Sequence, residues 1–313
     1  MFRTLRLVTC ASLLTLCGFA TAASAADLKV VASFSIIADL AKNVGGDRVK
    51  ITSLVGPDGD AHVYEPRPAD AASLEKANVV LVNGLQFEGF MSRLIEASGT
   101  KAPVVEVSKG IEPLKAEEEE HRHAHGDHGH EGHHHHGEFD PHAWQSIPNA
   151  EIYVKNIADA FCAADKAGCP TYTENSKTYL AKLAALQTEV KATIASIPEG
   201  KRTVITSHDA FGYFQHEYGL KFIAPEGIST EAEASAADVA KLIDQVREDK
   251  ASAIFVENIT NPRLVEQIAR ETGLKVGGTL YSDALSGSDG PAPTYIDMFR
   301  YNVNTIKNAI LGS

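Results

Sequence analysis

The sequence predicts an α/β protein with two parallel-sheet α/β lobes joined by one long rigid helix. Apolar strand runs alternate with amphipathic helix patterns from Leu28 onwards, and this alternation is typical of parallel sheets. A helix pattern without Gly or Pro then covers residues 171–197, which corresponds to roughly 40 Å of helix. That length exceeds what one small domain needs. The alternation restarts at Thr203, so we expect the helix to connect two lobes.

The first half of the chain has strand runs separated by helix patterns. Ile36, Ile37, Leu40 and Val44 recur at helical spacing after the first run, which predicts one buried helix face. The predicted strands are 28–33, 49–55, 79–84 and 102–107, and further helices are predicted at 68–77 and 88–97.

The second half repeats this alternation after two consecutive helix patterns. A helix at 149–164 precedes the long one, whose apolar residues fall at 3–4 spacing. These residues are Tyr179, Leu180, Leu183, Leu186, Val190 and Ile194. The predicted strands are then 203–206, 220–224, 252–256 and 275–276, and the predicted helices are 210–218, 235–248, 263–272 and 295–310.

The N-terminus has the pattern of a secretory signal over residues 1–25. Arg3 and Arg6 precede an apolar run that ends at Phe19, and an A-x-A cleavage site ends at Ala25. A lipid anchor at Cys17 is the alternative, but Leu16 before it is bulky for such processing. We expect a periplasmic protein with no membrane insertion after cleavage. Its predicted parts are an N-terminal lobe (26–145), a helical linker (146–198) and a C-terminal lobe (199–313).

Composition excludes some partners. The formal charge is −12 and apolar residues make up 44 % of the chain, so a packed core is expected and nucleic acid is not an expected partner. No stretch beyond the signal approaches the roughly 20 apolar residues of a membrane-spanning helix. We further expect a monomer.

Histidine is concentrated in a low-complexity stretch, the His-rich loop (115–138), which lies in the first lobe. Imidazole binds zinc, copper and nickel, so the stretch predicts a set of weak auxiliary metal sites. A solvated linker and a cloning tag are the alternatives, and the interruptions by Asp, Glu and Gly weigh against a tag. The histidines are His121, His123, His125, His128, His130, His133, His134, His135 and His136.

Two cysteines follow the predicted signal. Cys162 and Cys169 lie seven residues apart between two helix patterns. In an exported protein this spacing favours a disulfide. A two-cysteine metal site is the alternative, but no histidine lies within ten residues of either.

Four further residues occupy similar places in the predicted fold. His62 follows the second strand, His142 precedes a helix, His208 ends the first strand of the second half, and Asp283 follows its last strand. Ligands of open α/β sheets bind at the carboxyl ends of strands. We therefore expect these residues to meet in the cleft between the lobes, where three imidazoles and a carboxylate would suit Zn²⁺. His216 lies on a predicted helix and is not expected at the site.

The sequence around these four residues resembles that of a known family. The stretches 60–66 (DAHVYEP), 140–144 (DPHAW), 207–211 (SHDAF) and 281–285 (YSDAL) are similar to the zinc/manganese solute-binding proteins of bacterial ABC transporters. This is the ZnuA-like cluster A-I family, and the resemblance is closest to its AztC-type zinc-binding members. It covers nearly the whole mature chain. It implies a periplasmic receptor that captures one Zn²⁺ and delivers it to a membrane permease, with a zinc metallochaperone as a candidate second partner.

Two positions refine what the resemblance implies. Manganese members of the family generally carry Glu where this chain has His208, and an imidazole in place of an oxygen ligand favours zinc. Some members use a Glu beside the first histidine as a ligand, but here that neighbour is Ala61. Asp283 is therefore expected to complete the ligand set.

Three rival functions remain at this point. One is a manganese-binding receptor or adhesin of the same family. Another is a secreted zinc hydrolase, which would need an open metal position and a base such as Glu65 or Asp209, but the chain has no H-E-x-x-H motif. The third is a metal buffer in which the His-rich loop is the functional part.

Overall fold

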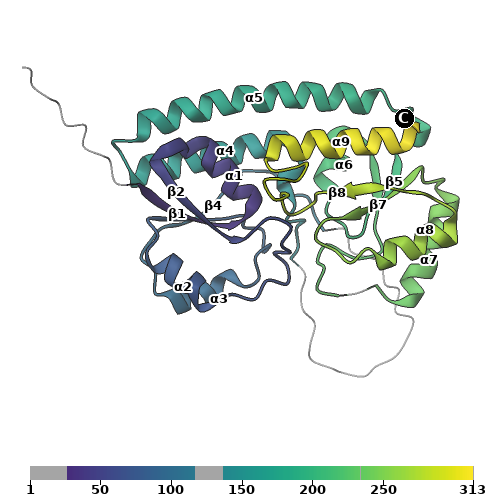
Figure 1. Ribbon diagram of the computed structural model, residues 1–313, viewed down its shortest axis with the longest axis horizontal. Coiled ribbons are helices and arrows are strands. Elements are labelled where there is room, and N and C mark those ends of the chain that lie inside the picture. Colours follow the sequence, from purple (N-terminus) through teal and green to yellow (C-terminus); the bar gives the residue numbers. More distant parts are fainter. Residues whose placement is uncertain (1–26, 117–136, 233, 313) are drawn as a thin grey trace, which may run out of the picture.

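The computed structural model describes residues 27–116, 137–232 and 234–312. Within these residues, the strands form two four-stranded parallel sheets that lie side by side (Figure 1), ordered β2-β1-β3-β4 and β6-β5-β7-β8. The two sheets thus share one topology, and the predicted fold class is confirmed. The strands are β1 (Leu28–Phe34), β2 (Val49–Val55), β3 (Val79–Val82), β4 (Val104–Glu106), β5 (Thr203–Ile205), β6 (Lys221–Ile223), β7 (Ala253–Glu257) and β8 (Val276–Leu280). The predicted signal peptide and the nine histidines at 121–136 lie outside the described residues.

Helices of the first half follow the predicted apolar spacing, with one difference. They are α1 (Ser35–Gly45), α2 (Pro68–Glu75), α3 (Met91–Ser98) and α4 (Ile147–Ala164). α3 begins at Met91 rather than at the predicted Glu88. Residues 89 and 90 form a turn instead, in which the Met91 backbone N–H donates to the Glu88 carbonyl three residues earlier, at 3.1 Å, rather than four residues earlier as in an α-helix.

The long helix α5 (Cys169–Ala195) runs along both lobes (Figure 1). It packs against α1 and α4 of the first half and against α6 and α9 of the second half. Its buried residues repeat every three or four positions, which places them on one face. They are Tyr172, Ser176, Tyr179, Leu183, Leu186, Val190 and Ile194. Cys162 at the end of α4 forms the predicted disulfide with Cys169 at the start of α5.

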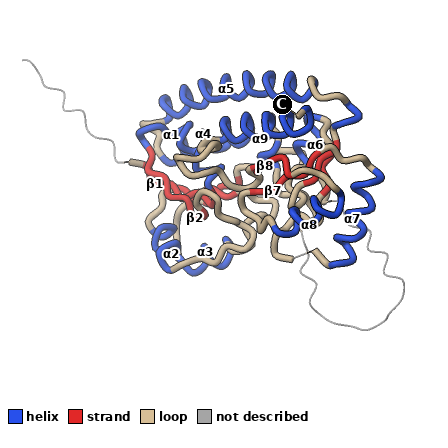
Figure 2. Tube along the Cα trace, turned by 45° about the vertical axis from the view of Figure 1, so that its right-hand side comes forward, coloured by secondary structure: helices blue, strands red, loops and turns tan. Residues whose placement is uncertain are grey.

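The remaining helices cover the second sheet. They are α6 (Gly212–Tyr218), α7 (Ala236–Glu248), α8 (Arg263–Thr272) and α9 (Tyr295–Leu311). Figure 2 shows α5 and α9 on one side of the molecule and α7 and α8 on the other side of the second lobe. No helix within the described residues is both long enough and apolar enough to cross a membrane.

One apolar core extends through both lobes. It includes Val31 of β1, Leu183 of α5 and Phe255 of β7, whereas a smaller cluster around Ile254 and Ile268 lies between the second sheet and α7 and α8. Because interiors are close-packed, a shared core resists displacement of one lobe relative to the other. The cleft between the two sheets therefore has a defined geometry.

Candidate metal centre

The four residues predicted as ligands meet where the two sheets face each other. His62, His142, His208 and Asp283 each offer a ligand atom, and these atoms all lie within 4.8 Å of one another. Asp283 Oδ2 is 3.1 Å from His208 Nε2, 3.2 Å from His62 Nε2 and 3.6 Å from His142 Nε2. The two Nε2 atoms of His62 and His142 are 3.4 Å apart. This group of three histidines and one aspartate could hold a metal ion.

Two of the histidines have a carboxylate behind the ring. Asp140 Oδ1 accepts a hydrogen bond from the backbone N–H of His142 (2.9 Å) and lies 2.8 Å from its Nδ1. Glu257, at the end of β7, accepts the backbone N–H of His208 (2.9 Å), and its Oε2 lies 2.7 Å from His208 Nδ1. The latter is an ion-pair contact whose alignment falls short of a hydrogen bond. Carboxylates in this position orient an imidazole so that Nε2 faces a metal.

Close packing positions one of these carboxylates. Asp140 Oδ2 lies over Gly212 at the start of α6, where an added Cβ would come within 2.5 Å of it. Only glycine leaves that space free. Gly212, at the start of α6 in the second lobe, thus leaves room for the carboxylate of Asp140, which orients His142 of the first lobe.

His62 is held differently. Its backbone N–H donates to Asp60 Oδ1 at 2.8 Å. The other oxygen of Asp60 accepts a hydrogen bond from Thr230 of the second lobe at 2.6 Å, so it does not orient the imidazole. The ring instead packs edge to face against Phe87, with centroids 4.8 Å apart. In the described part of the chain, no ion pair is formed at His62 Nδ1.

Asp283 lies on a loop held from the first lobe. Trp144 Nε1 and Gln145 Nε2 both donate to the carbonyl of the preceding Ser282, at 2.9 and 2.7 Å. Asp283 is fully buried, and among the described residues its Oδ1 has no hydrogen-bond partner. A buried polar oxygen without a partner is costly. A cation bound by this carboxylate would remove that cost.

Burial and charge pull the ionisation of the site in opposite directions. Burial opposes the charged form of His142, but Asp283 and Asp140 raise its pKa to about 9. Burial likewise opposes protonation of His208, yet Glu257 and Asp283 raise its pKa well above the ordinary value. Burial would also raise the pKa of Asp283, but His142 and His208 hold it well below the usual range. At His62 burial dominates and lowers the pKa. Without metal, the cluster thus retains protons on the two histidines that have carboxylates behind them.

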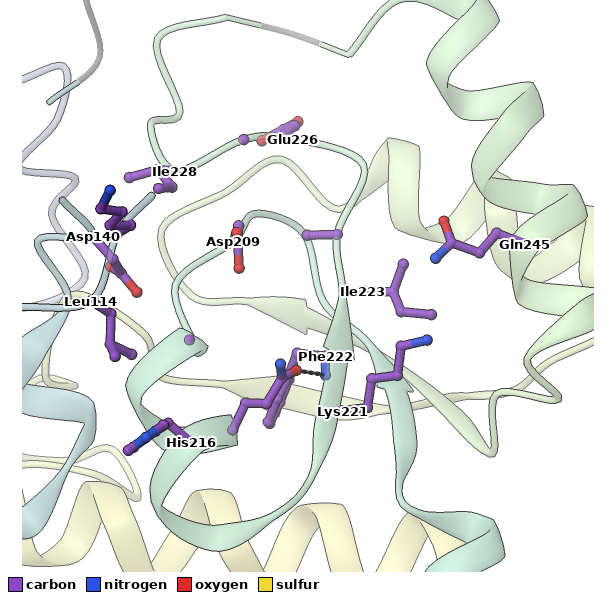
Figure 3. A pocket seen from close by; sticks show the side chains of 15 residues that line it. Leu114, Asp140, Asp209, His216, Lys221, Phe222, Ile223, Glu226, Ile228 and Gln245 are labelled. Atoms are coloured by element: carbon purple, nitrogen blue, oxygen red, sulfur yellow. Dashed lines mark hydrogen bonds between the residues drawn. The ribbon is translucent and has the colours of Figure 1, made fainter. Parts of the chain in front are cut away.

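His216, Trp144 and Tyr213 lie near this cluster but are not part of it. His216 is exposed and lines a separate cavity of about 500 Å³, which Asp140 also lines (Figure 3). Trp144 packs against the ring of His142 at 5.3 Å. Tyr213 donates a hydrogen bond to the carbonyl of Asp140. These two aromatic residues pack around the site without contributing a ligand atom.

Sequence reasoning missed the residues that orient the ligands. Glu257 ends a strand at the same sheet edge as His208, and that position could have marked it. Asp140 stands two residues before His142, and this short spacing could also have marked it. Phe87 carried no sequence signal.

Comparison with known proteins identifies the family to which this chain belongs. Residues 30–309 match the model of the family described as zinc-uptake complex component A, periplasmic (ZnuA). The chain belongs to this family. It is therefore a metal-binding receptor of an ABC transporter that works with a membrane permease, not an enzyme. An extracytoplasmic location is consistent with this membership.

The relatives and solved structures similar to this chain are named for different metals. The chain is 36 % identical over 305 residues to the manganese-binding lipoprotein MntA of Bacillus subtilis, covering 95 % of each protein. It is 34 % identical over 283 residues to the iron-binding protein YfeA of Yersinia pestis, covering 90 % of this chain and 86 % of that one. The structure of the periplasmic zinc-binding protein TroA from Treponema pallidum aligns with a TM-score of 0.81 at 29 % identity, covering 91 % of this chain and 99 % of that one. Family membership therefore does not determine which metal this chain binds, and the ligands of its own site must be considered.

Proposed function

We propose that this protein is a periplasmic high-affinity zinc receptor that captures Zn²⁺ in the cleft and delivers it to its cognate permease for import. His62, His142, His208 and Asp283 would be the ligands. The distances among their ligand atoms carry the proposal. A tetrahedral zinc ion with bonds of about 2.0–2.1 Å places its ligand atoms about 3.3 Å apart. Of the six separations among the four ligand atoms, four run from 3.1 to 3.6 Å, and all six are within 4.8 Å.

The kinds of ligand atom support the same metal. Three imidazole nitrogens suit zinc, whereas manganese favours carboxylate, carbonyl and water oxygens. Asp140 and Glu257 at the far side of two imidazoles increase the basicity of these rings. A soluble mature form after cleavage at Ala25, the zinc metallochaperone and a monomeric state remain part of the proposal.

A manganese or iron receptor is the second candidate. Relatives named for manganese and for iron favour it. Asp283 Oδ1, which has no hydrogen-bond partner among the described residues, also favours it, because it could add a fifth ligand atom for an ion with a larger coordination number.

We propose that the His-rich loop collects Zn²⁺ for the tight site when zinc is scarce. Deleting residues 117–137 is expected to leave one tight site with a nearly unchanged dissociation constant, because the proposed ligands lie elsewhere in the chain. Slower loading from a donor at scarce zinc is the expected consequence. A large loss of affinity on deletion would place ligands of the tight site in the loop.

Metal content and competition test the proposal directly. Protein purified from the periplasm without a tag should contain one tightly bound zinc, and manganese in excess should not displace it in a competition titration. In a thermal melt, zinc at a thousandfold excess over its dissociation constant should stabilise the fold by about 4 kcal/mol. His208→Glu, which supplies an oxygen ligand, should narrow the preference for zinc over manganese. A wild-type protein that binds manganese more tightly would refute the zinc assignment.

A further inference from the structure

His62 lacks the support that the other two histidines have. His142 and His208 each have a carboxylate within 2.8 Å of Nδ1. Among the described residues, His62 has instead three aromatic ring contacts. The ring of Phe87 is nearest, with centroids 4.8 Å apart, and those of His142 and His208 follow at 5.5 and 5.7 Å. Because two of these contacts are with proposed ligands, Phe87 is the non-ligand ring that defines the orientation of His62.

Phe87 is itself fixed by the rings around it. It is 2 % exposed. Its ring packs against Trp144 at 4.8 Å and against Phe34 at 5.0 Å, and those two rings are 4.9 Å apart. Aromatic rings in edge-to-face and tilted contacts have defined relative orientations. This aromatic cluster therefore presents a rigid edge to His62.

The backbone before Phe87 adopts unfavourable conformations to reach this position. Leu85 and Gln86 have φ values of +54° and +62° and follow Gly84 at +85°. Side-chain-bearing residues rarely adopt this region, and such strain clusters at functional sites. An ordinary core phenylalanine requires no strained approach.

Buried hydrogen bonds on both sides maintain the strained turn. The Glu88 carboxylate accepts from Ser33 Oγ at 2.5 Å and from the Asn83 backbone N–H at 2.6 Å. The Asn83 side chain donates to the carbonyl of Pro141 at 2.9 Å. Since Pro141 directly precedes His142, the turn that carries Phe87 is also tied to a second proposed ligand.

From this geometry we propose that Phe87 is a positioning residue for His62 that controls how long the metal stays bound. Its ring takes the place of the carboxylate that orients the other two histidines. An apolar ring edge restricts the orientation of the imidazole without accepting a hydrogen bond from Nδ1. His62 is then the ligand that detaches first when the metal leaves. This inference rests on the proposed function, because it takes the four-residue cluster as the receptor's metal site.

The test measures the dissociation of Zn²⁺ into excess chelator by stopped flow. Phe87→Leu is expected to speed dissociation about 10- to 100-fold, the range found for residues that orient metal ligands, and Phe87→Tyr should restore a rate close to the wild type. Phe90→Leu is the matched control, because Phe90 is also buried but packs against Tyr64 instead of a ligand. It should leave the rate unchanged.

A double-mutant cycle distinguishes positioning from packing. In a His62→Ala background, Phe87→Leu should change the dissociation rate by no more than about twofold. The absorption spectrum of bound Co²⁺ should change in Phe87→Leu but not in Phe90→Leu. A wild-type rate in Phe87→Leu, with only a lower melting temperature of the metal-free protein, would refute the proposal. An undiminished effect in the His62→Ala background would refute it as well.

Failure of the proposed function would be visible separately. If the wild-type protein binds Mn²⁺ more tightly than Zn²⁺, the zinc assignment fails, and the same cycle carried out with Mn²⁺ still decides the role of Phe87.

Discussion

The two carboxylate-backed histidines and His62 show two ways of holding a metal ligand. His142 and His208 are each fixed at the backbone N–H and at Nδ1 by one carboxylate, from Asp140 and Glu257. His62 has a carboxylate on its backbone N–H alone, because the second oxygen of Asp60 bonds Thr230 instead. The pKa values follow this division, raised for the first two and lowered for His62. A receptor must bind its ion tightly and also release it, and one less constrained ligand provides a place where release can begin.

Removing the ligands themselves should have the largest effect. His142→Ala and His208→Ala are expected to lower zinc affinity by orders of magnitude, since each also leaves a buried carboxylate without its partner. His62→Ala should cost less, because no supporting carboxylate loses its imidazole, and Asp283 keeps its contacts with His142 and His208. Asp283→Ala is expected to weaken binding too, although water could replace its oxygen. Affinities measured by chelator competition check this order, with His216→Ala as the unchanged control. Equal losses of zinc affinity in the variants of His62, His142, His208 and His216 would contradict the assigned site. They would also contradict the proposed difference between His62 and the two carboxylate-backed histidines.

Neutralising the supporting carboxylates should have an intermediate effect. Asp140→Asn and Glu257→Gln preserve shape but remove the charge behind each ring, so zinc affinity should fall about 10- to 100-fold. Asp60→Asn should change affinity less, because Asp60 contacts only the backbone of His62. Isothermal titration of the three variants would test this. A loss in Asp60→Asn as large as in Glu257→Gln would mean that His62 is oriented by Asp60 after all.

Zinc affinity should rise with pH. The pKa of His142 is about 9 in the metal-free protein, above the ordinary value of about 6.5. Protonation therefore stabilises the metal-free fold fully below about 6.5, and this contribution disappears as the pH rises through about 9. Zinc must displace these protons below that pH. The gap in melting temperature between zinc-loaded and metal-free protein should therefore widen from pH 6.5 to 9. A constant gap would show that neither His142 nor His208 is protonated before binding.

The disulfide should have the smallest effect on metal binding. Cys162→Ser together with Cys169→Ser removes a short cross-link between α4 and α5, which is expected to cost about 2 kcal/mol of unfolding free energy. Zinc affinity should stay unchanged, because the disulfide supplies no atom to the cluster. Denaturant melts and zinc titrations of the double variant would show the two effects separately. A parallel loss of affinity would indicate that the α4–α5 junction influences the site.

Much of the protein could be predicted from the sequence alone. Apolar spacing determined α5, because its buried residues follow the period of the helix itself. Strand–helix alternation determined both sheets, and the position of His208 just after β5 pointed to the site. Predictions of element boundaries were weakest where contacts with other parts of the chain override the local sequence preference. β8 extends to Leu280 through two glycines because it pairs with β7. α3 begins only at Met91 because residues 89 and 90 form a turn.

Only the tertiary structure decided which groups act on each ligand. His62 and Asp283 are separated by 221 positions, and His208 and Glu257 by 49, so no local pattern could relate them. Motifs indicated which residues could bind metal, because the ligand chemistry of a side chain does not depend on its neighbours. The orientation of each imidazole depends instead on its neighbours, which sheet packing brings together. That is why Glu257 lies behind His208 and Phe87 beside His62, whereas Asp140 is already close to His142 in the sequence.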